Sequence, residues 1–439
     1  MLTWEISRAF IQYHLQQGFA LLSRTSLLHP SLPMTFVMSA GLAQIEEGVS
    51  RSRAVDNDKY VLSQTCFRHF DLSKVGLSPY HLSLFEMPGA FVFGSKPKRD
   101  SIERLWYFIT TVLEISPDTL WVTYFAPDPD GVGRYCVDNE SYEAWRATGV
   151  PESRLIGLSQ NHWTQGNGLG TQTRYRKAGV TTEIYVDRGA TRHCDSECRP
   201  GCSCSRFLEI ANNLFISEEI DTDTGYVSRV VNPLTETVIG VERVAIVLQG
   251  VSSVFEIDIF ADAFEQLRSL ISLKHGEYIT SVHAKVLLDH LRALIALVAD
   301  GAPLPGKNGR ERIIRLLIRG ILTRAKLLEL SAPGDIWSIQ DRLIETTYNY
   351  PHLAIKNIDG KVMDYIRDEQ NRFERTLQSA YRHLDRMLEL NNGQGLTEEQ
   401  VSRLVKQYGL PLPMLIESGV PIEPGATSRL SFEMGLSHL

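Results

Sequence analysis

The hydrophobic periodicity of this 439-residue chain changes near residue 252, and the change limits the folds that the chain can adopt. Before that point, short runs rich in β-branched and aromatic residues, such as LWVTYFA (120–126), predict strands. The segments after it that repeat apolar residues at helical spacing are 262–274, 281–299, 309–330 and 361–390. The sequence therefore predicts an α+β domain over 1–251, followed by a mostly helical domain over 252–439.

Local patterns in the first domain predict where individual helices and strands lie. WEISRAFIQYHLQQ (4–17) has apolar residues at near-helical spacing and stops at Gly18, which predicts an amphipathic helix. PMTFVMSAG (33–41) predicts a buried strand, and DSIERLWYFITTVLEI (100–115) predicts a helix. In HLSLFEM (81–87), a period of two would place alternate residues, beginning at the histidine, on one face of a strand.

The overall composition argues against a membrane-spanning protein, an exported protein and a general nucleic-acid binder. Hydrophobic residues make up 43% of the chain and charged residues 22%, as in ordinary globular proteins. No uninterrupted apolar stretch is long enough to span a bilayer, and MLTWEISRAF has no basic leader before an apolar block. The net charge of −7 argues against a general nucleic-acid binder. We therefore expect a cytoplasmic protein with no membrane partner.

Four of the six cysteines lie within the short segment HCDSECRPGCSC, at Cys194, Cys198, Cys202 and Cys204. Tetrahedral zinc takes four soft donors, and a turn containing glycine and proline can fold four thiolates around one ion. Because four protein ligands leave no open position, such a zinc ion would be structural. The alternatives are a set of free surface thiols or a redox pair.

Three residues around a predicted strand–loop–strand segment could bind a nucleotide. Arg68 lies in SQTCFRHFDL, and His81 and Phe85 lie on the strand that follows the loop. An arginine and a histidine could hold a phosphate while the aromatic ring stacks on a purine. The alternative is that Phe85 belongs to the core and that His81 is a hydrogen-bonded buried side chain.

Two further groups of cations stand out. Arg243 follows the strand-like run TETVI, where it could bind an anion or form a buried structural ion pair. The segment GKNGRERIIRLLIRGILTRAK (306–326) has one acid among many cations, which predicts either a surface for a polyanion or a solvated helix face. The cations of this segment that we consider for such a surface are Lys307, Arg310, Arg312, Arg315 and Arg319.

In this order, the motifs resemble those of the alanyl-tRNA synthetases, a family of class II aminoacyl-tRNA synthetases. The resemblance runs from the first predicted helix to about residue 415. The stretches that carry it are SQTCFRHFDLSKVG, HLSLFEM, TEIYVDRG, the cysteine cluster with RFLEIANNLF, GVERVAIVLQGV, FEIDIF, and DHLRALIALVADG with GRERIIRLLIR. The spacing of the cysteines and the HLxxFEM pattern are closer to archaeal-type members of the family.

The resemblance implies a fold and an activity. The fold would be a class II core, an antiparallel β-sheet flanked by helices. The activity would be the activation of alanine or a similar small amino acid with ATP and Mg²⁺, followed by transfer of the aminoacyl group to the 3′ end of a tRNA. By the same resemblance, Arg68 would bind the α-phosphate, His81 another phosphate, Phe85 the adenine and Arg243 the γ-phosphate. Trp163 and Asn212 would line the amino-acid pocket.

The sequence departs from the family pattern at the amino-acid pocket. The family has Asp-Thr-Gly where this chain has Glu236, Thr237 and Val238, and an arginine where this chain has Tyr80. Glu236 keeps the negative charge on a longer arm, and Val238 adds volume in place of glycine. We therefore expect both residues to line a re-shaped pocket.

The predicted acceptor side departs further. Lys307 and Lys406 stand where the family has an asparagine and an aspartate that read the acceptor stem, and this favours phosphate contact over base readout. The sequence also stops before the family's editing domain. Two alternatives follow: a diverged paralogue that transfers the activated amino acid to a small-molecule amine, a nucleoside-type metabolite or a carrier protein, or a catalytically silent tRNA-binding protein.

Overall fold

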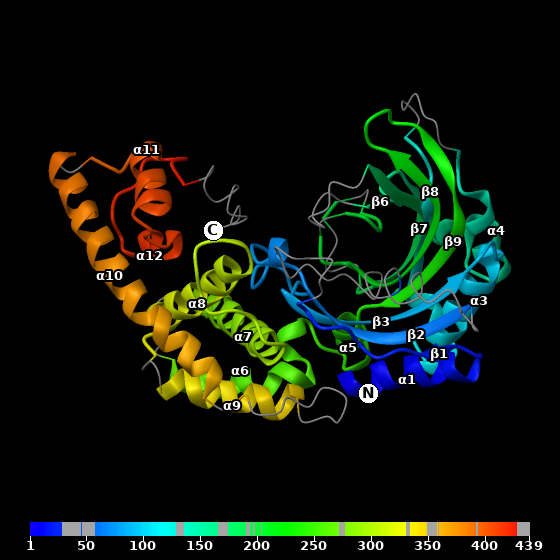
Figure 1. The fold of residues 1–439 in the computed structure, drawn as a ribbon, viewed down its shortest axis with the longest axis horizontal. Coiled ribbons are helices and arrows are strands. Elements are labelled where there is room, and N and C mark those ends of the chain that lie inside the picture. Colours follow the sequence, from blue (N-terminus) through cyan, green and yellow to red (C-terminus); the bar gives the residue numbers. More distant parts are fainter. Residues whose placement is uncertain are drawn as a thin grey trace. The chain divides into compact units, whose positions relative to one another are not determined.

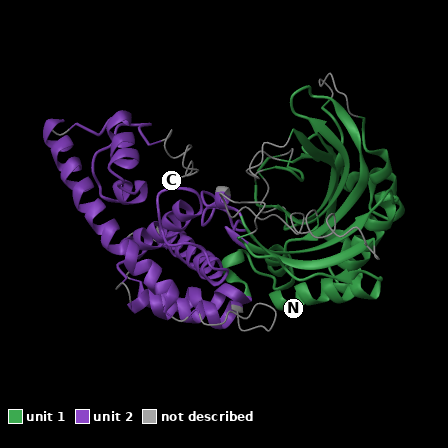
Figure 2. Ribbon diagram, in the orientation of Figure 1, with its two compact units in different colours: residues 1–67, 85–257 green, residues 68–84, 258–439 purple. Residues whose placement is uncertain are grey.

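The structure is a computed structural model, and its described residues form two compact units (Figure 2). Unit 1 consists of residues 1–67 and 85–257, and unit 2 of residues 68–84 and 258–439. The residues that the structure describes are 1–28, 45, 58–128, 136–165, 174–189, 194–195, 198–202, 204–271, 277–330, 334–348, 358, 360–391 and 394–427.

Unit 1 is built on one nine-stranded sheet with the order β1-β2-β3-β9-β8-β7-β4-β5, in which β6 pairs with β7 beside this path. The pairs that β7 forms with β4, β6 and β8 are antiparallel, as are β8–β9 and β3–β9. The strands are β1 (Ala20–Leu21), β2 (Lys59–Phe67), β3 (Leu84–Phe93), β4 (Leu120–Phe125), β5 (Leu155–Leu158), β6 (His162–Thr164), β7 (Tyr175–Asp187), β8 (Phe207–Asp221) and β9 (Val227–Ile239).

Helices cover one face of this sheet (Figure 1). The Trp145 indole of α4 donates a hydrogen bond of 2.7 Å to Thr182 Oγ1 of β7, which fixes α4 against that face. The helix α1 buries Ile6 and Phe10 along one side and ends before Gly18, whose φ of +82° favours glycine. The helices of unit 1 are α1 (Thr3–Gln16), α3 (Lys98–Tyr107), α4 (Asn139–Ala147) and α5 (Val241–Leu248).

The opposite face of the sheet, called here the inner face, carries a cluster of buried apolar side chains. Phe91 of β3 is fully buried, and Leu214 of β8 and Leu234 of β9 are 5% exposed. Side chains on a strand alternate between faces, so these residues point away from Thr182 and its α4 contact. The inner face therefore has an apolar part, and the polar residues described below share that face with it.

Unit 2 is helical and includes the segment 68–84. Asp289 of α7 accepts hydrogen bonds from Ser83 N and Oγ at 2.8 and 2.5 Å, and Arg292 donates one of 2.6 Å to Leu84 O. These contacts fasten the segment to α7. The helices of unit 2 are α6 (Asp258–Leu270), α7 (Glu277–Ala299), α8 (Gly309–Leu327), α9 (Gly334–Tyr348), α10 (Lys361–Leu390), α11 (Glu398–Ser402) and α12 (Leu412–Glu417).

The structure confirms the predicted fold class and several of the predicted elements. The helices predicted over 4–17 and 361–390 are present, and Arg243 lies four residues after the end of a strand, in the first turn of α5. The helix predicted over 100–115 ends at Tyr107 and continues as a π turn, Phe108–Val112. No helix among the described residues is long and apolar enough to cross a membrane.

One strand prediction was wrong at its start, and another cannot be compared. β3 begins at Leu84, so His81 and Ser83 precede the strand and do not share a face with Phe85 through its alternation. The reason is that Ser83 and Leu84 form hydrogen bonds with α7. The strand predicted over 33–41 lies outside the described residues. The assignment of adenylation to 1–251 and tRNA recognition to 252–439 stays a prediction.

Candidate active site and metal centre

A row of four side chains, three of them polar, crosses the inner face of the sheet. The strand registers pair Thr123 with Glu183, Glu183 with Asn212, and Asn212 with Val238. Residues paired across antiparallel strands point to the same face, so β4, β7, β8 and β9 each contribute one member of the row. Val238 is 5% exposed and ends the row beside Gly89 of β3.

Glu236 lies on the same face, two residues before Val238 on β9. Its cross-strand neighbours are Leu214 and Phe91, and its own side chain is 5% exposed. Trp163 of β6 packs against the apolar cluster that contains Leu214 and Phe91. The structure thus places the residues predicted to line the amino-acid pocket, Trp163, Asn212, Glu236 and Val238, on one face of one sheet.

A β-bulge in β8 adds the Glu209 carboxylate to this face, beside those of Glu183 and Glu236. Ile184 pairs with Ala211 but Tyr185 pairs with Glu209, so β8 has one extra residue at this point. Without the bulge, Glu209 and Asn212, three residues apart, would point to opposite faces. With it, Glu209 lies on the inner face together with Asn212 and Tyr185.

Arg243 contacts the Glu209 carboxylate. It is the third residue of α5, and its Nη1 donates to Glu209 Oε2 at 2.9 Å and to the Glu209 carbonyl at 3.2 Å. The side chains of Arg243 and Glu209 are 26% and 35% exposed. Ion pairs that remain this accessible to water contribute little net stability, so the guanidinium can exchange Glu209 for an anionic ligand at small cost.

Glu183 accepts several hydrogen bonds in the polar row. The Tyr185 hydroxyl donates to its Oε2 at 2.6 Å, Asn212 Nδ2 to its Oε1 at 3.3 Å, and Thr123 Oγ1 to its Oε2 at 3.4 Å. Removal of the carboxyl from water and the nearby charge of Glu209 raise the pKa of Glu183 to about 7. These two causes outweigh the donated hydrogen bonds, which favour the charged form.

The predicted nucleotide-binding residues are divided between the two units. Arg68 and His81 belong to the segment 68–84 of unit 2, and Phe85 belongs to β3 of unit 1. Arg68 N donates to Ser83 O at 2.8 Å, and His81 Nδ1 lies 2.7 Å from Ser78 Oγ. On β3, the period of two puts Phe85 on the inner face with Phe91.

The cations of α8 differ in their surroundings. Arg319 Nε donates to Glu369 Oε1 of α10 at 2.7 Å, and Glu369 is fully buried, so this arginine helps to hold α8 against α10. Arg310 and Arg315 are partly buried, and burial lowers the pKa of both. Lys307, Arg312 and Lys406 are exposed. A role for all six in binding an acceptor stays a prediction.

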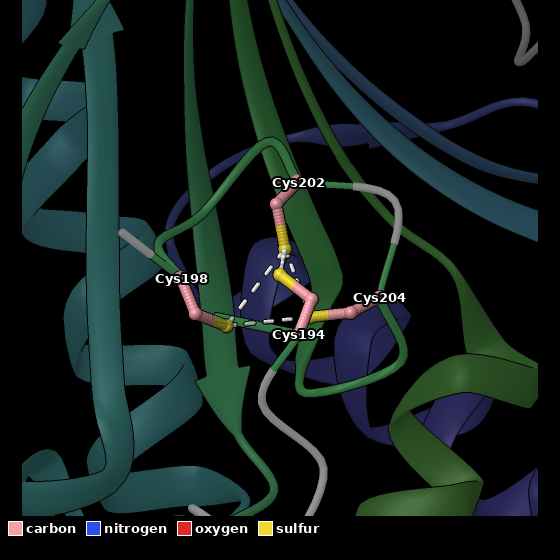
Figure 3. Close-up of side chains that lie close together, drawn as sticks. All are labelled: Cys194, Cys198, Cys202 and Cys204. Atoms are coloured by element: carbon pink, nitrogen blue, oxygen red, sulfur yellow. Dashed lines mark hydrogen bonds between the residues drawn. The ribbon is translucent and has the colours of Figure 1, made fainter. Parts of the chain in front are cut away.

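The four clustered cysteines lie together in the connection between β7 and β8 (Figure 3). Their sulfur atoms all lie within 4.8 Å of one another, with pairs at 3.4, 3.7 and 3.9 Å and one at 2.8 Å. A tetrahedral ion with metal–sulfur bonds of about 2.3 Å separates its sulfur ligands by about 3.8 Å. Cys194, Cys198, Cys202 and Cys204 therefore fit a structural zinc ion after small shifts.

Two features of the connection bring these cysteines together. Arg206 donates to both carboxylate oxygens of Asp187, at 2.8 and 2.7 Å, and so closes its base where β7 ends and β8 begins. Gly201, between the second and third cysteines, has a φ of +91°. A Cβ at Gly201 would lie 2.8 Å from Gln160 Nε2, but that atom ends a flexible side chain that can shift, so it is the positive φ that favours glycine here.

Comparison with known proteins identifies the family of this chain. Residues 5–419 match the family described as tRNA synthetases class II (A). The chain belongs to this family. It is 29% identical over 422 residues to the alanine–tRNA ligase of Clostridioides difficile and 32% identical over 426 residues to that of Pelotomaculum thermopropionicum.

The two matches cover 94% of this chain but only 45% and 46% of those relatives, so the chain spans about half of their length. Among solved structures, apo histidyl-tRNA synthetase from S. aureus is 10% identical, with 61% of this chain and 76% of that chain covered. Its TM-score of 0.33 is too low to support an argument about this class II chain.

Sequence reasoning missed three residues of the site in this class II synthetase: Glu183, Tyr185 and Glu209. The alternation in TEIYVD indicates that Glu183 and Tyr185 share a face of the strand. Glu209 could not be assigned in this way, because its face depends on the bulge in β8. No residue type in RFLEIANN marks that bulge.

We predict that the cysteine cluster binds about one zinc ion per chain and that the ion stabilises unit 1. Replacing Cys202 with serine should remove the zinc and lower the unfolding temperature, and a strong chelator should do the same to the unchanged protein. Metal content by mass spectrometry and thermal unfolding test this. Cys136→Ser is the matched control, since Cys136 is exposed and outside the cluster. Full zinc content in Cys202→Ser would contradict the assignment.

We predict that the titration of Glu183 makes the stability of unit 1 depend on pH. Its pKa in the folded protein, about 7, is above the ordinary value of 4.5, so its contribution to stability is complete below 4.5 and is lost as the pH rises through 7. The unfolding free energy of the unchanged protein should therefore fall relative to Glu183→Gln across this window. Urea unfolding at several pH values measures this difference. Parallel pH curves for the two proteins would refute the prediction, and Glu219→Gln provides a control on β8.

Proposed function

We propose that this chain is an ATP-dependent ligase of the alanine–tRNA ligase type, which activates a small amino acid as its aminoacyl-adenylate and transfers it to the 3′ end of a tRNA. The observation that carries the proposal is the position of Arg243. Its guanidinium sits at the edge of the inner face, beside Glu209 and near the row that contains Glu183 and Asn212. A cation for phosphates thus lies on the same surface as polar groups suited to an amino acid.

The chemistry proposed is an in-line attack of the amino-acid carboxylate on the α-phosphorus of ATP, with pyrophosphate as the leaving group. Arg243 would release Glu209 and stabilise the negative charge of the terminal phosphate, which a fixed cation does best in a partly desolvated site. Family resemblance assigns the α-phosphate to Arg68, a phosphate contact to His81 and the adenine stack to Phe85. Each of these three assignments is a proposal about one residue and does not depend on the other two.

The Mg²⁺ that accompanies ATP would find a suitable ligand in Glu209. Mg²⁺ prefers hard oxygen ligands such as carboxylates and phosphates, and the Glu209 carboxylate is partly exposed next to Arg243. When bound, the ion would neutralise phosphate charge. Glu209 would then have two partners in turn, Arg243 in the empty site and the metal in the loaded one.

The amino-acid substrate would be small. Glu236 and Asn212 offer oxygen atoms that can accept hydrogen bonds from an ammonium group. Trp163, Leu214 and Val238 are among the apolar residues on the same face. Because Val238 and Glu236 are both 5% exposed, little of either side chain is accessible, which supports a substrate with a short side chain such as alanine.

The transfer to tRNA rests on two supports. The relatives that match 94% of this chain are named alanine–tRNA ligases, and α8 presents the exposed Arg312 with Lys307 just before it. Exposed cations along one helix suit the phosphates of an acceptor stem. Arg319, which pairs with the buried Glu369, would contribute to this surface by holding α8 in place.

We predict that Arg243→Ala abolishes amino-acid-dependent pyrophosphate exchange, lowering its rate about a hundredfold or more, because a fixed cation on the leaving pyrophosphate is lost. Exchange measured across the twenty amino acids should first identify the substrate, with alanine or a close relative expected. The control is Arg229→Ala, an exposed arginine on the same strand that leads to Arg243.

Two outcomes would count against this assignment. Exchange by Arg243→Ala at near the unchanged rate would remove Arg243 from phosphate binding. An unchanged protein that exchanges with none of the twenty amino acids would contradict the proposed adenylation of a standard amino acid. Equal unfolding temperatures for Arg243→Ala and Arg229→Ala would show that a loss of exchange is not a loss of fold.

We predict that Lys307→Ala combined with Arg312→Ala weakens the charging of tRNA several-fold while pyrophosphate exchange stays unchanged. Each lost phosphate contact should also reduce the slope of affinity against salt concentration by about 1. Charging of total tRNA and its salt dependence are the measurements. Arg342→Ala on α9, an exposed arginine of the same unit, is the control. Brisk exchange by the unchanged protein without any charged tRNA would overturn the proposed acceptor.

A further inference from the structure

Glu183 connects three strands of the sheet through its carboxylate. Tyr185 belongs to β7 itself, Thr123 to the neighbouring β4, and Asn212 to the neighbour on the other side, β8. All three donate to the carboxylate, at 2.6, 3.4 and 3.3 Å respectively. A side chain held by several donors on different strands has little rotational freedom, so Glu183 is a fixed point in the polar row.

This fixed carboxylate determines which way the amide of Asn212 faces. Asn212 Nδ2 donates to Glu183 Oε1, which turns the amide oxygen away from Glu183. Asn212 Oδ1 is buried and accepts no hydrogen bond from any residue that the structure describes. A buried acceptor of this kind is costly unless a donor reaches it, and a bound ligand can supply that donor.

We propose that Glu183 is a positioning residue, which orients the amide of Asn212 so that its oxygen accepts a hydrogen bond from the ammonium group of the amino-acid substrate. The inference rests on the proposed function, because it takes an amino acid as the ligand of the inner face. It adds Glu183 as a residue that determines amino-acid binding without itself touching the substrate. The effect on binding passes through Asn212.

The chemistry of a carboxylate explains why this position needs glutamate. Tyr185 and Asn212 each donate to a different oxygen of Glu183, so the side chain must offer two acceptors. Glutamine has only one. If its oxygen accepts from the closer donor, Tyr185, its NH₂ group faces Asn212 and can be satisfied only when the Asn212 amide turns around. The NH₂ group of Asn212 would then face the substrate ammonium, donor against donor.

The experiment is a double-mutant cycle between these two positions. Glu183→Gln should raise the KM for the amino acid on the order of tenfold, the effect of one lost hydrogen bond to a charged group, with little change in kcat or in the KM for ATP. Asn212→Asp should rescue Glu183→Gln, because an aspartate accepts from Gln NH₂ with one oxygen and presents the other to the ammonium. In the unchanged background, Asn212→Asp should be harmful, since it faces one carboxylate with another.

Thermal unfolding of the same four proteins decides the pairing without any catalysis. Each single variant should unfold several degrees below the unchanged protein, and the double variant should recover most of that loss. Glu219→Gln, on β8 but outside the row, is the matched control for both readouts and should behave like the unchanged protein.

The outcomes separate this inference from the proposed function. An unchanged amino-acid KM in Glu183→Gln, or a double variant no better than the singles in either readout, would overturn the positioning role. Absence of amino-acid-dependent exchange in the unchanged protein would overturn the proposed function instead, and the thermal cycle would still show whether Glu183 orients Asn212.

Discussion

The site depends on the register of β8 between β7 and β9. In this register, Asn212 of β8 pairs with Glu183 of β7 on one side and with Val238 of β9 on the other. Asn212 therefore lies between the acidic and the apolar member of the row. A slip of one residue would turn Asn212 to the helix-covered face and put Ala211 or Asn213 in its place. The bulge before Ala211 then lets Glu209 join the same face. The strand pairing therefore sets the chemistry of the inner face before any ligand binds.

Collecting Glu183, Glu209 and Glu236 on one face has an electrostatic cost that the fold offsets locally. Like charges close together disfavour ionisation, and the raised pKa of Glu183 reflects its burial and the charge of Glu209. Arg243 offsets part of this repulsion by pairing with Glu209. An acidic face beside the Arg243 guanidinium suits the ligands that we propose, which bring an ammonium group or a divalent cation together with phosphates.

The sequence predicted those parts of the structure that depend on local signals. Arg243 after a strand, the four cysteines in one short turn, and α10 are each visible in a few consecutive residues. Glu209 required the position of a bulge, which depends on pairing between strands and leaves no local signal. The predicted start of β3 was wrong for a similar reason. Ser83 and Leu84 form hydrogen bonds with residues of α7, which lie more than two hundred residues away in the sequence. The sequence groups Arg319 with surface cations, whereas in the structure it forms an ion pair with the buried Glu369 of α10.

Val238 shows how a single departure from the family pattern is accommodated. A Cβ added to Gly89, its cross-strand partner, would lie 3.4 Å from Val238 Cγ1 and 2.9 Å from Phe91 Cε2. The valine methyl group thus leans over the bare backbone of Gly89, next to the Phe91 ring. Because the glycine on β3 absorbs part of the added volume, Val238 can be buried without displacing β3 from β9. The same methyl group stands at the end of the row that Asn212 occupies, so the added volume lies beside the residues that we propose for the amino-acid pocket.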